Sequence, residues 1–148
     1  MFERYNEDAR RALFFTRYET SLLGGCTIET EHLLLGLIRD PRSPVRALLE
    51  RGRVSLDDIR VRVERRTARG ERVSTATEIP FSDEMKGVLA HAAEEADALT
   101  SADVGAEHLL LGILREDDCL AASILRDLGL DLERARGCLP VAADDRQT

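Results

Sequence analysis

The chain has 148 residues, of which 43% are hydrophobic, 33% are charged and 4% are aromatic, and this length suits one domain or two small ones sharing a core. Its net charge of −7 divides into +2 for residues 1–80 and −9 for residues 81–148, an acidity that repels phosphate and argues against a nucleic-acid binder. The sequence lacks the ~18 uninterrupted apolar residues of a membrane span, and its charged start is no secretory signal, so we expect a cytoplasmic protein without membrane contact.

The sequence contains two copies of one unit. Residues 30–39 recur at 106–115, an offset of 76 positions. At that offset residues 5–63 align without a gap with residues 81–139 and share 13 identical pairs, six of them consecutive at 31–36. We interpret this as an internal duplication.

Each copy is predicted to form four short helices. The first begins after Asn6 or Ser82, whose side chains can cap free backbone N–H groups, and Gly24 follows its end in the first copy. The second, at 31–39 or 107–115, is apolar on nearly all sides and is expected at the centre of the fold.

The two remaining helices of each copy have weaker starts. The third begins near Pro44 or Cys119, and the fourth at Ser55 or Asp131. The fold class is therefore all-α, with two four-helix repeats related by a pseudo-twofold axis. The expected divisions are a first repeat at 1–66, a linker at 67–80, a second repeat at 81–140 and a flexible tail at 141–148.

A Glu-His pair opens the second helix of each copy, Glu31-His32 and Glu107-His108. A helical zinc site needs two histidines four residues apart, and neither H-E-x-x-H nor H-x-x-E-H occurs. We therefore expect no metal, no cofactor and no catalytic residue, with each histidine hydrogen-bonded beside the helix start. A metal-dependent hydrolase built from these four residues is the enzymatic alternative.

Gly36 and Gly112 lie inside the second helices, where glycine costs about 1 kcal/mol relative to alanine. Their recurrence predicts helices that cross too closely to admit a methyl group. The sequence also has one basic run, in which acidic residues are interleaved. We interpret it as a solvated surface in preference to a nucleic-acid site; its members are Arg60, Arg62, Arg65, Arg66, Arg69 and Arg72.

Five of the six aromatic residues fall within the first 18 positions. On a helix, Phe14 and Tyr18 lie opposite the inward stripe, whereas the second copy has Ala90 and Glu94 there. This extra apolar face either packs against the other repeat or binds a partner or a second copy of the chain. The candidate partner-binding residues are Phe2, Phe14, Phe15, Tyr18 and Phe81.

These motifs resemble the Clp N-terminal domain, the double Clp repeat of ClpA- and ClpC-type AAA+ unfoldases. The resemblance is carried by the first five residues, by both Glu-His-Leu-Leu-Leu-Gly segments, by Ile79-Pro80-Phe81-Ser82 and by Leu128-Gly129. It implies an all-helical, non-catalytic domain that docks substrates and adaptors for an ATP-driven unfoldase. The expected partners are such an unfoldase, an adaptor or a client.

The same resemblance implies a phosphoarginine site. By motif, Glu31 and Glu107 would pair with the guanidinium group and Thr30 would hold the phosphate. This sequence departs from the usual Gly-Thr-Glu-His start, with Glu29 in place of glycine and Ala106 in place of threonine. We expect a free-standing Clp-repeat protein; the alternative is the N-terminal fragment of a full unfoldase.

Overall fold

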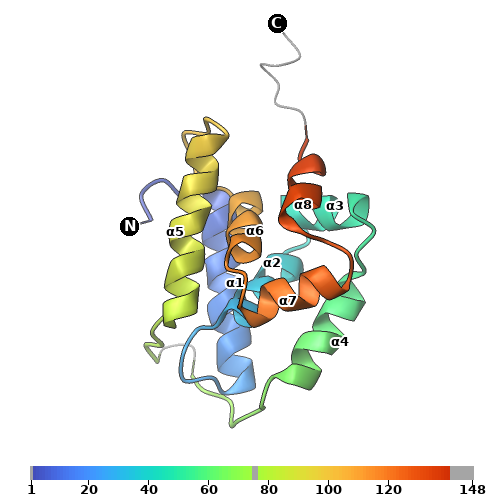
Figure 1. Ribbon diagram of the computed structural model, residues 1–148. Coiled ribbons are helices and arrows are strands. Elements are labelled where there is room, and N and C mark those ends of the chain that lie inside the picture. Colours follow the sequence, from blue (N-terminus) through green and yellow to red (C-terminus); the bar gives the residue numbers. More distant parts are fainter. Residues whose placement is uncertain (1, 75–76, 141–148) are drawn as a thin grey trace, which may run out of the picture.

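The computed structural model describes residues 2–74 and 77–140, and the predicted tail at 141–148 lies outside them. This part of the chain is helical, without a β-strand (Figure 1), so the all-α prediction is confirmed. The helices are α1 (Glu7–Leu23), α2 (Thr30–Arg39), α3 (Pro44–Arg51), α4 (Leu56–Arg66), α5 (Asp83–Ala98), α6 (Ala106–Arg115), α7 (Leu120–Asp127) and α8 (Leu132–Gly137).

Local capping explains where the long helices begin and end. The Asn6 side chain accepts from the Ala9 N–H (3.0 Å), and the Ser82 side chain accepts from the Met85 N–H (3.1 Å). α1 ends at Gly24, whose φ of 73° is left-handed and favours glycine. None of the helices in the described residues is long and apolar enough to cross a membrane.

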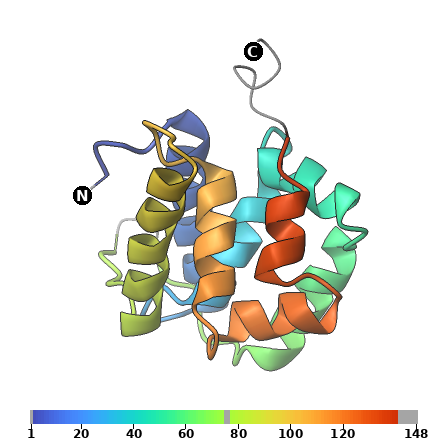
Figure 2. The ribbon, with the colours of Figure 1, turned by 45° about the horizontal axis from the view of Figure 1, so that its top comes forward.

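The centre of the fold is formed by α2 and α6, the two apolar helices (Figure 2). Helix α1 crosses α2 at Gly36, where an added Cβ would lie 2.8 Å from the Ala12 carbonyl oxygen. Helix α5 crosses α6 at Gly112, where it would lie 2.5 Å from the Val88 carbonyl oxygen. The prediction of close crossings is therefore confirmed.

Each repeat holds the first segment of the other. The Asn6 N–H donates to the Val104 carbonyl (3.0 Å), and the Ser82 N–H donates to the Ile28 carbonyl (3.1 Å). The repeat offset relates both donors and both acceptors. These bonds, with the bridges Tyr5–Val104 and Ile28–Phe81, join the repeats into one body with a shared core.

A buried glutamate pairs with two arginines at related places in the two repeats. Glu19 on α1 accepts from Arg39 of α2 (2.6 Å) and from Arg60 of α4 (3.1 Å). In the second repeat, the related Glu95 accepts from Arg115 (3.4 Å) and from Arg136 (2.6 Å). In each repeat the carboxylate thus ties the fourth helix to the first two.

Candidate functional site

A cleft of about 410 Å³ lies beside α1, next to the segments that precede α1 and α5. Three of the five candidate aromatics, Phe2, Phe14 and Phe81, line it. Its remaining walls are two charged arginines, one acidic residue and three aliphatic side chains: Arg10, Arg17, Glu78, Leu13, Ile28 and Ile79.

The cleft combines an apolar surface with a charged rim. The ring centroids of Phe2 and Phe81 lie 6.2 Å apart, edge to face, and Phe14 is 66% exposed. Arg10 is held by its Nε, which donates to the Tyr5 carbonyl (2.9 Å), whereas Arg17 has no hydrogen bond or ion pair to a described residue. Such a cleft suits an apolar side chain beside an anionic group.

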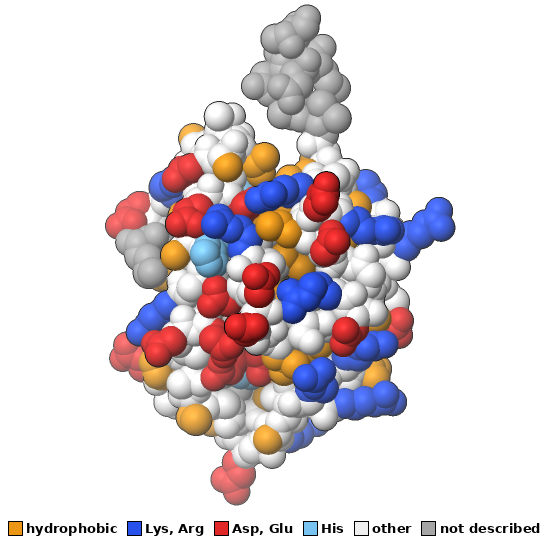
Figure 3. All heavy atoms as spheres, viewed as in Figure 1, with side chains coloured by type: hydrophobic (Ala, Val, Ile, Leu, Met, Phe, Trp, Pro, Cys, Tyr) orange, Lys and Arg blue, Asp and Glu red, His pale blue; other side chains and the backbone are white. Residues whose placement is uncertain are grey.

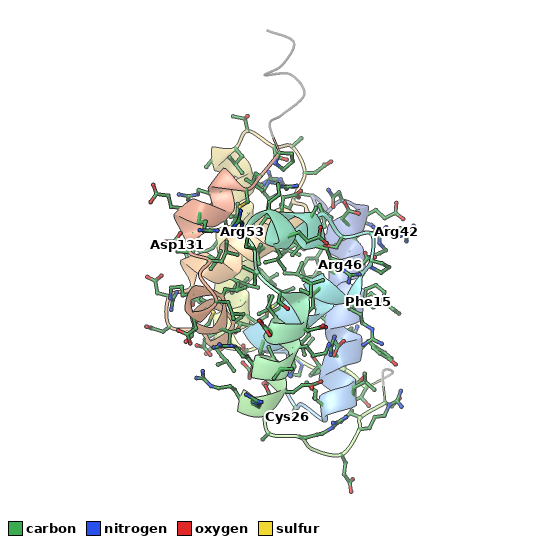
Figure 4. All side chains as sticks on the ribbon, turned by 90° about the vertical axis from the view of Figure 1, so that its right-hand side faces the viewer. Phe15, Cys26, Arg42, Arg46, Arg53 and Asp131 are labelled. Carbon is green, nitrogen blue, oxygen red and sulfur yellow. The ribbon has the colours of Figure 1, made fainter. Side chains whose placement is uncertain are left out.

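The two other candidate aromatics lie elsewhere. The Arg39 guanidinium lies over the Tyr18 ring, 4.5 Å from its centroid, so Tyr18 faces α2. Phe15 contacts Phe14 edge to face (5.4 Å) but lies on the side of the molecule that carries Arg42 (Figure 4). The structure therefore does not bring all five residues into one surface.

Two of the residues that α1 contributes to the cleft have no counterpart in the second repeat. At the repeat offset, Ala90 and Ala93 take the places of Phe14 and Arg17. The sequence comparison of the two copies therefore pointed to Phe14, but the contribution of Arg10 and Arg17 to its rim was missed. A signal was present for Arg17, which is replaced by alanine in the second copy, but not for Arg10, which is matched there by Lys86.

The Glu-His motifs lie at the starts of α2 and α6, where both histidines have a structural role. The Glu29 N–H donates to His32 Nδ1 (2.9 Å), and the Gly105 N–H donates to His108 Nδ1 (2.8 Å). Burial lowers the pKa of both imidazoles, because the charged form loses water. The predicted hydrogen-bonded histidines are confirmed.

Thr30, the residue expected at a phosphate, is turned into the protein. It is 1% exposed, and its Oγ1 accepts from the Ala121 N–H of α7 (3.4 Å). Glu31 beside it is partly exposed. Burial raises the pKa of the Glu31 carboxyl, and the nearby carboxylates of Glu29 and Glu84 add to that rise.

The surface around Glu31 is acidic, and Figure 3 shows acidic side chains gathered on this face of the molecule. Glu84 is close enough to influence both Glu31 and Cys119, and Glu116 also influences Cys119. We call Glu29, Glu31, Glu84 and Glu116 the acidic patch. At the related start of α6, Glu107 packs against Gly105.

No group of three or more His, Cys, Asp or Glu residues in the described ranges is placed to hold a metal ion. Glu31, His32, Glu107 and His108 therefore form no metal centre there. The metal-hydrolase alternative requires both histidines in one site, but His32 and His108 each accept a backbone hydrogen bond at the start of a different helix.

Comparison with known proteins decides the family. Residues 4–128 match the Clp repeat (R) N-terminal domain. The chain belongs to this family. A ClpA homolog of Guillardia theta, an ATP-binding subunit of an ATP-dependent Clp protease, is 40% identical over 136 residues. That alignment covers 92% of this chain and 16% of the relative, so the chain spans about one sixth of its length.

Solved Clp repeat structures have the same architecture. The N-terminal domain of ClpD from Arabidopsis thaliana is 30% identical, with a TM-score of 0.73 and 93% of each chain covered. The ClpV N-domain in complex with a VipB peptide is 18% identical, with a TM-score of 0.70, covering 86% of this chain and 81% of that one. The second likeness concerns the fold alone.

Proposed function

We propose that this Clp repeat domain docks segments of other proteins and performs no chemistry itself. The observation that carries the proposal is the aromatic cleft of Phe2, Phe14 and Phe81, which leaves apolar surface exposed beside charged groups. Its ligand is an apolar segment of a client or adaptor of a Clp-type unfoldase. The VipB peptide bound to a ClpV N-domain supports a peptide as the class of ligand.

A non-catalytic role fits the chemistry of the motifs. Nδ1 of His32 and Nδ1 of His108 each already accept from a backbone N–H, so that nitrogen is not free to take a proton from a substrate. The relatives are subunits whose names describe an ATP-dependent protease and chaperones, which supports a role in supplying proteins to such a machine. A cytoplasmic location stays a prediction from the sequence.

Substituting Phe14 tests the cleft. Fluorescein-labelled β-casein serves as an unfolded client, and its affinity is measured by fluorescence anisotropy. We expect Phe14→Ser to weaken binding by about tenfold, because Phe14 is a large, 66% exposed aromatic side chain of the cleft. The matched control is Val61→Ser on α4, another exposed apolar residue, at 43% exposure, that does not line this cleft.

Casein affinity that is equal for the wild type, Phe14→Ser and Val61→Ser contradicts the proposal. Light scattering on the same samples reports self-association. A mass above that of one chain in the wild type, lost in Phe14→Ser alone, assigns the cleft to a second copy of the chain instead of to a client.

We further propose that the acidic patch at the start of α2 binds an unmodified arginine side chain. A carboxylate such as Glu31 pairs bidentately with a guanidinium group. The neighbouring carboxylates of Glu29 and Glu84 attract a cation and repel a phosphate. The hydroxyl of Thr30 is buried against α7, which favours arginine over phosphoarginine as the ligand.

Titration with N-acetylarginine amide and with phosphoarginine, followed by amide chemical shifts, tests this preference. We expect arginine to shift the amides of residues 30–33 and phosphoarginine to bind at least about threefold more weakly, because of charge repulsion. Glu31→Gln should abolish the arginine shifts, whereas Glu107→Gln, at the related position, should preserve them. Tighter binding of phosphoarginine contradicts the preference.

A further inference from the structure

The arginines of the two repeats differ in how they are partnered. In the second repeat, every arginine in the described ranges donates to a carboxylate or a carbonyl. Arg115 and Arg136 bond to Glu95, Arg126 to the Asp117 carbonyl and Arg134 to the Gly52 carbonyl.

Three arginines near the end of α4 are unpartnered. Arg62, Arg65 and Arg66 are exposed, and none forms a hydrogen bond or ion pair within the ranges that the structure describes. Figure 3 shows basic side chains over the lower right of the molecule, where α4 lies in Figure 1. Neighbouring like charges repel and so destabilise the folded protein, and an anionic ligand would reduce this repulsion.

These arginines form one wall of a cleft between α4 and α7. The cleft has a volume of about 330 Å³, and its lining is completed by Ile124 and Asp127 of α7. Ile124 is 1% exposed, so the accessible wall of the cleft consists mainly of the arginines and Asp127. Asp127 forms no ion pair with the arginines, so their guanidinium groups remain available to a ligand.

The related junction in the other half, between α3 and α8, is closed. Arg51 Nε donates to the Cys138 carbonyl (2.6 Å), and a second bond joins α8 to the residue after α3. At the repeat offset, Arg51 of the α3–α8 junction corresponds to Asp127 of the α4–α7 junction. Cys138 of the α3–α8 junction corresponds to Arg62 of the α4–α7 junction. Helix α4 also runs for 11 residues, whereas α8 has 6. The open, arginine-lined cleft is therefore particular to one junction.

We propose that the α4–α7 cleft binds an acidic protein segment, in which an aliphatic side chain is flanked by carboxylates. The carboxylates pair with Arg62, Arg65 and Arg66, and the aliphatic side chain packs against the methylene stems of these arginines. Guanidinium groups pair with carboxylates in bidentate geometry, which gives the cleft its charge complementarity. This surface lies apart from the aromatic cleft and has a ligand of different charge.

The lining favours a peptide over a nucleic acid. No aromatic residue lines the cleft, so unpaired bases have nothing to stack on. The net charge of −7 also repels a long polyanion, whereas a short acidic segment meets only the local basic surface.

The test uses a fluorescein-labelled peptide with an Asp-Glu-Leu-Asp-Glu core, a neutral peptide with an Asn-Gln-Leu-Asn-Gln core, and a labelled single-stranded oligonucleotide. The charge variant is R62Q/R65Q/R66Q. The matched control, R42Q/R46Q/R53Q, removes the same charge from the surface around α3 (Figure 4). Thermal unfolding checks that both variants are folded.

We expect the acidic peptide to bind the wild type and the control alike at about 50 mM salt, and the charge variant at least about tenfold more weakly. The neutral peptide should bind none of them. The proposal is overturned if the acidic peptide fails to bind the wild type, or if both triple variants weaken it equally. It is also overturned if the oligonucleotide binds the wild type more tightly than the peptide.

Discussion

Replacing Gly36 with alanine is expected to lower the free energy of unfolding by about 2–3 kcal/mol, because the new methyl group enters a helix crossing that has no space for it. The added Cβ would lie 2.7 Å from the Thr16 backbone nitrogen and 2.8 Å from the Ala12 carbonyl oxygen. These are backbone atoms of α1, so relief requires the two helices to separate. The better helix propensity of alanine, about 1 kcal/mol, is too small to offset this.

The measurement is thermal unfolding followed by circular dichroism. For a chain of this size the loss corresponds to a Tm lower by roughly 5–10 °C. Gly112→Ala should behave in the same way, since its Cβ would lie 3.0 Å from the Ala92 backbone nitrogen. Gly137→Ala is the control, because nothing lies within 4 Å of a Cβ there. A Tm for Gly36→Ala equal to that of the control would mean that the crossing tolerates the methyl group.

The second large effect is expected for the buried glutamates. Glu19→Gln leaves Arg39 and Arg60 without the carboxylate that pairs with both, at 2.6 Å and 3.1 Å. Removing one partner of a fully buried ion pair costs about 3–5 kcal/mol. The two arginines here are 35% exposed and can turn toward water, so we expect a loss of about 2 kcal/mol in urea unfolding at about pH 7.

The pH dependence separates this pair from simple loss of packing. Burial alone would raise the pKa of Glu19, but hydrogen bonds from Arg60 and Arg39 outweigh it and hold the pKa below the ordinary 4.5. Because the pKa of Glu19 is lower in the folded state, the ion pair contributes its full stabilisation of the folded protein above pH 4.5. This stabilisation is lost as the pH falls through the folded-state pKa. The difference between the wild type and Glu19→Gln should therefore shrink in acid.

Glu64→Gln is the matched control, because Glu64 faces the same Arg60 at 3.8 Å but is 49% exposed. Its expected effect is below about 0.5 kcal/mol. If Glu64→Gln costs as much as Glu19→Gln, burial is not what makes the pair at Glu19 strong. A Glu19→Gln difference that stays constant from about pH 7 to about pH 3 would also reject an ionic origin.

Some features could be recognised in the sequence only with the structure at hand. Glu19, Arg39 and Arg60 are each identical to the residue 76 positions later, yet they are 20 and 21 positions apart from one another. These separations match no helical spacing. The sequence therefore showed three charged residues that recur in both copies, but it did not indicate that they form one ion-pair cluster. Pairing each repeated charge with an opposite repeated charge would have suggested it.

The sequence by itself determined the local structure. Asn6, Ser82, Ser55 and Asp131 cap the helices that they were predicted to cap, because capping depends on atoms three residues away. The apolar 31–39 and 107–115 segments could only be buried, and the glycines within them indicated close crossings. These properties depend on near neighbours or on the duplication, both of which are visible in the order of residues.

Only the tertiary structure decided which surfaces are open. Phe2 and Phe81 share a cleft because backbone bonds across the repeat interface bring residues 4–6 and 80–82 to the same side of the core. The same folding turns Tyr18 toward Arg39 and leaves a cleft between α4 and α7. Contacts between residues so far apart in the chain depend on the path of the whole chain, which no local pattern contains.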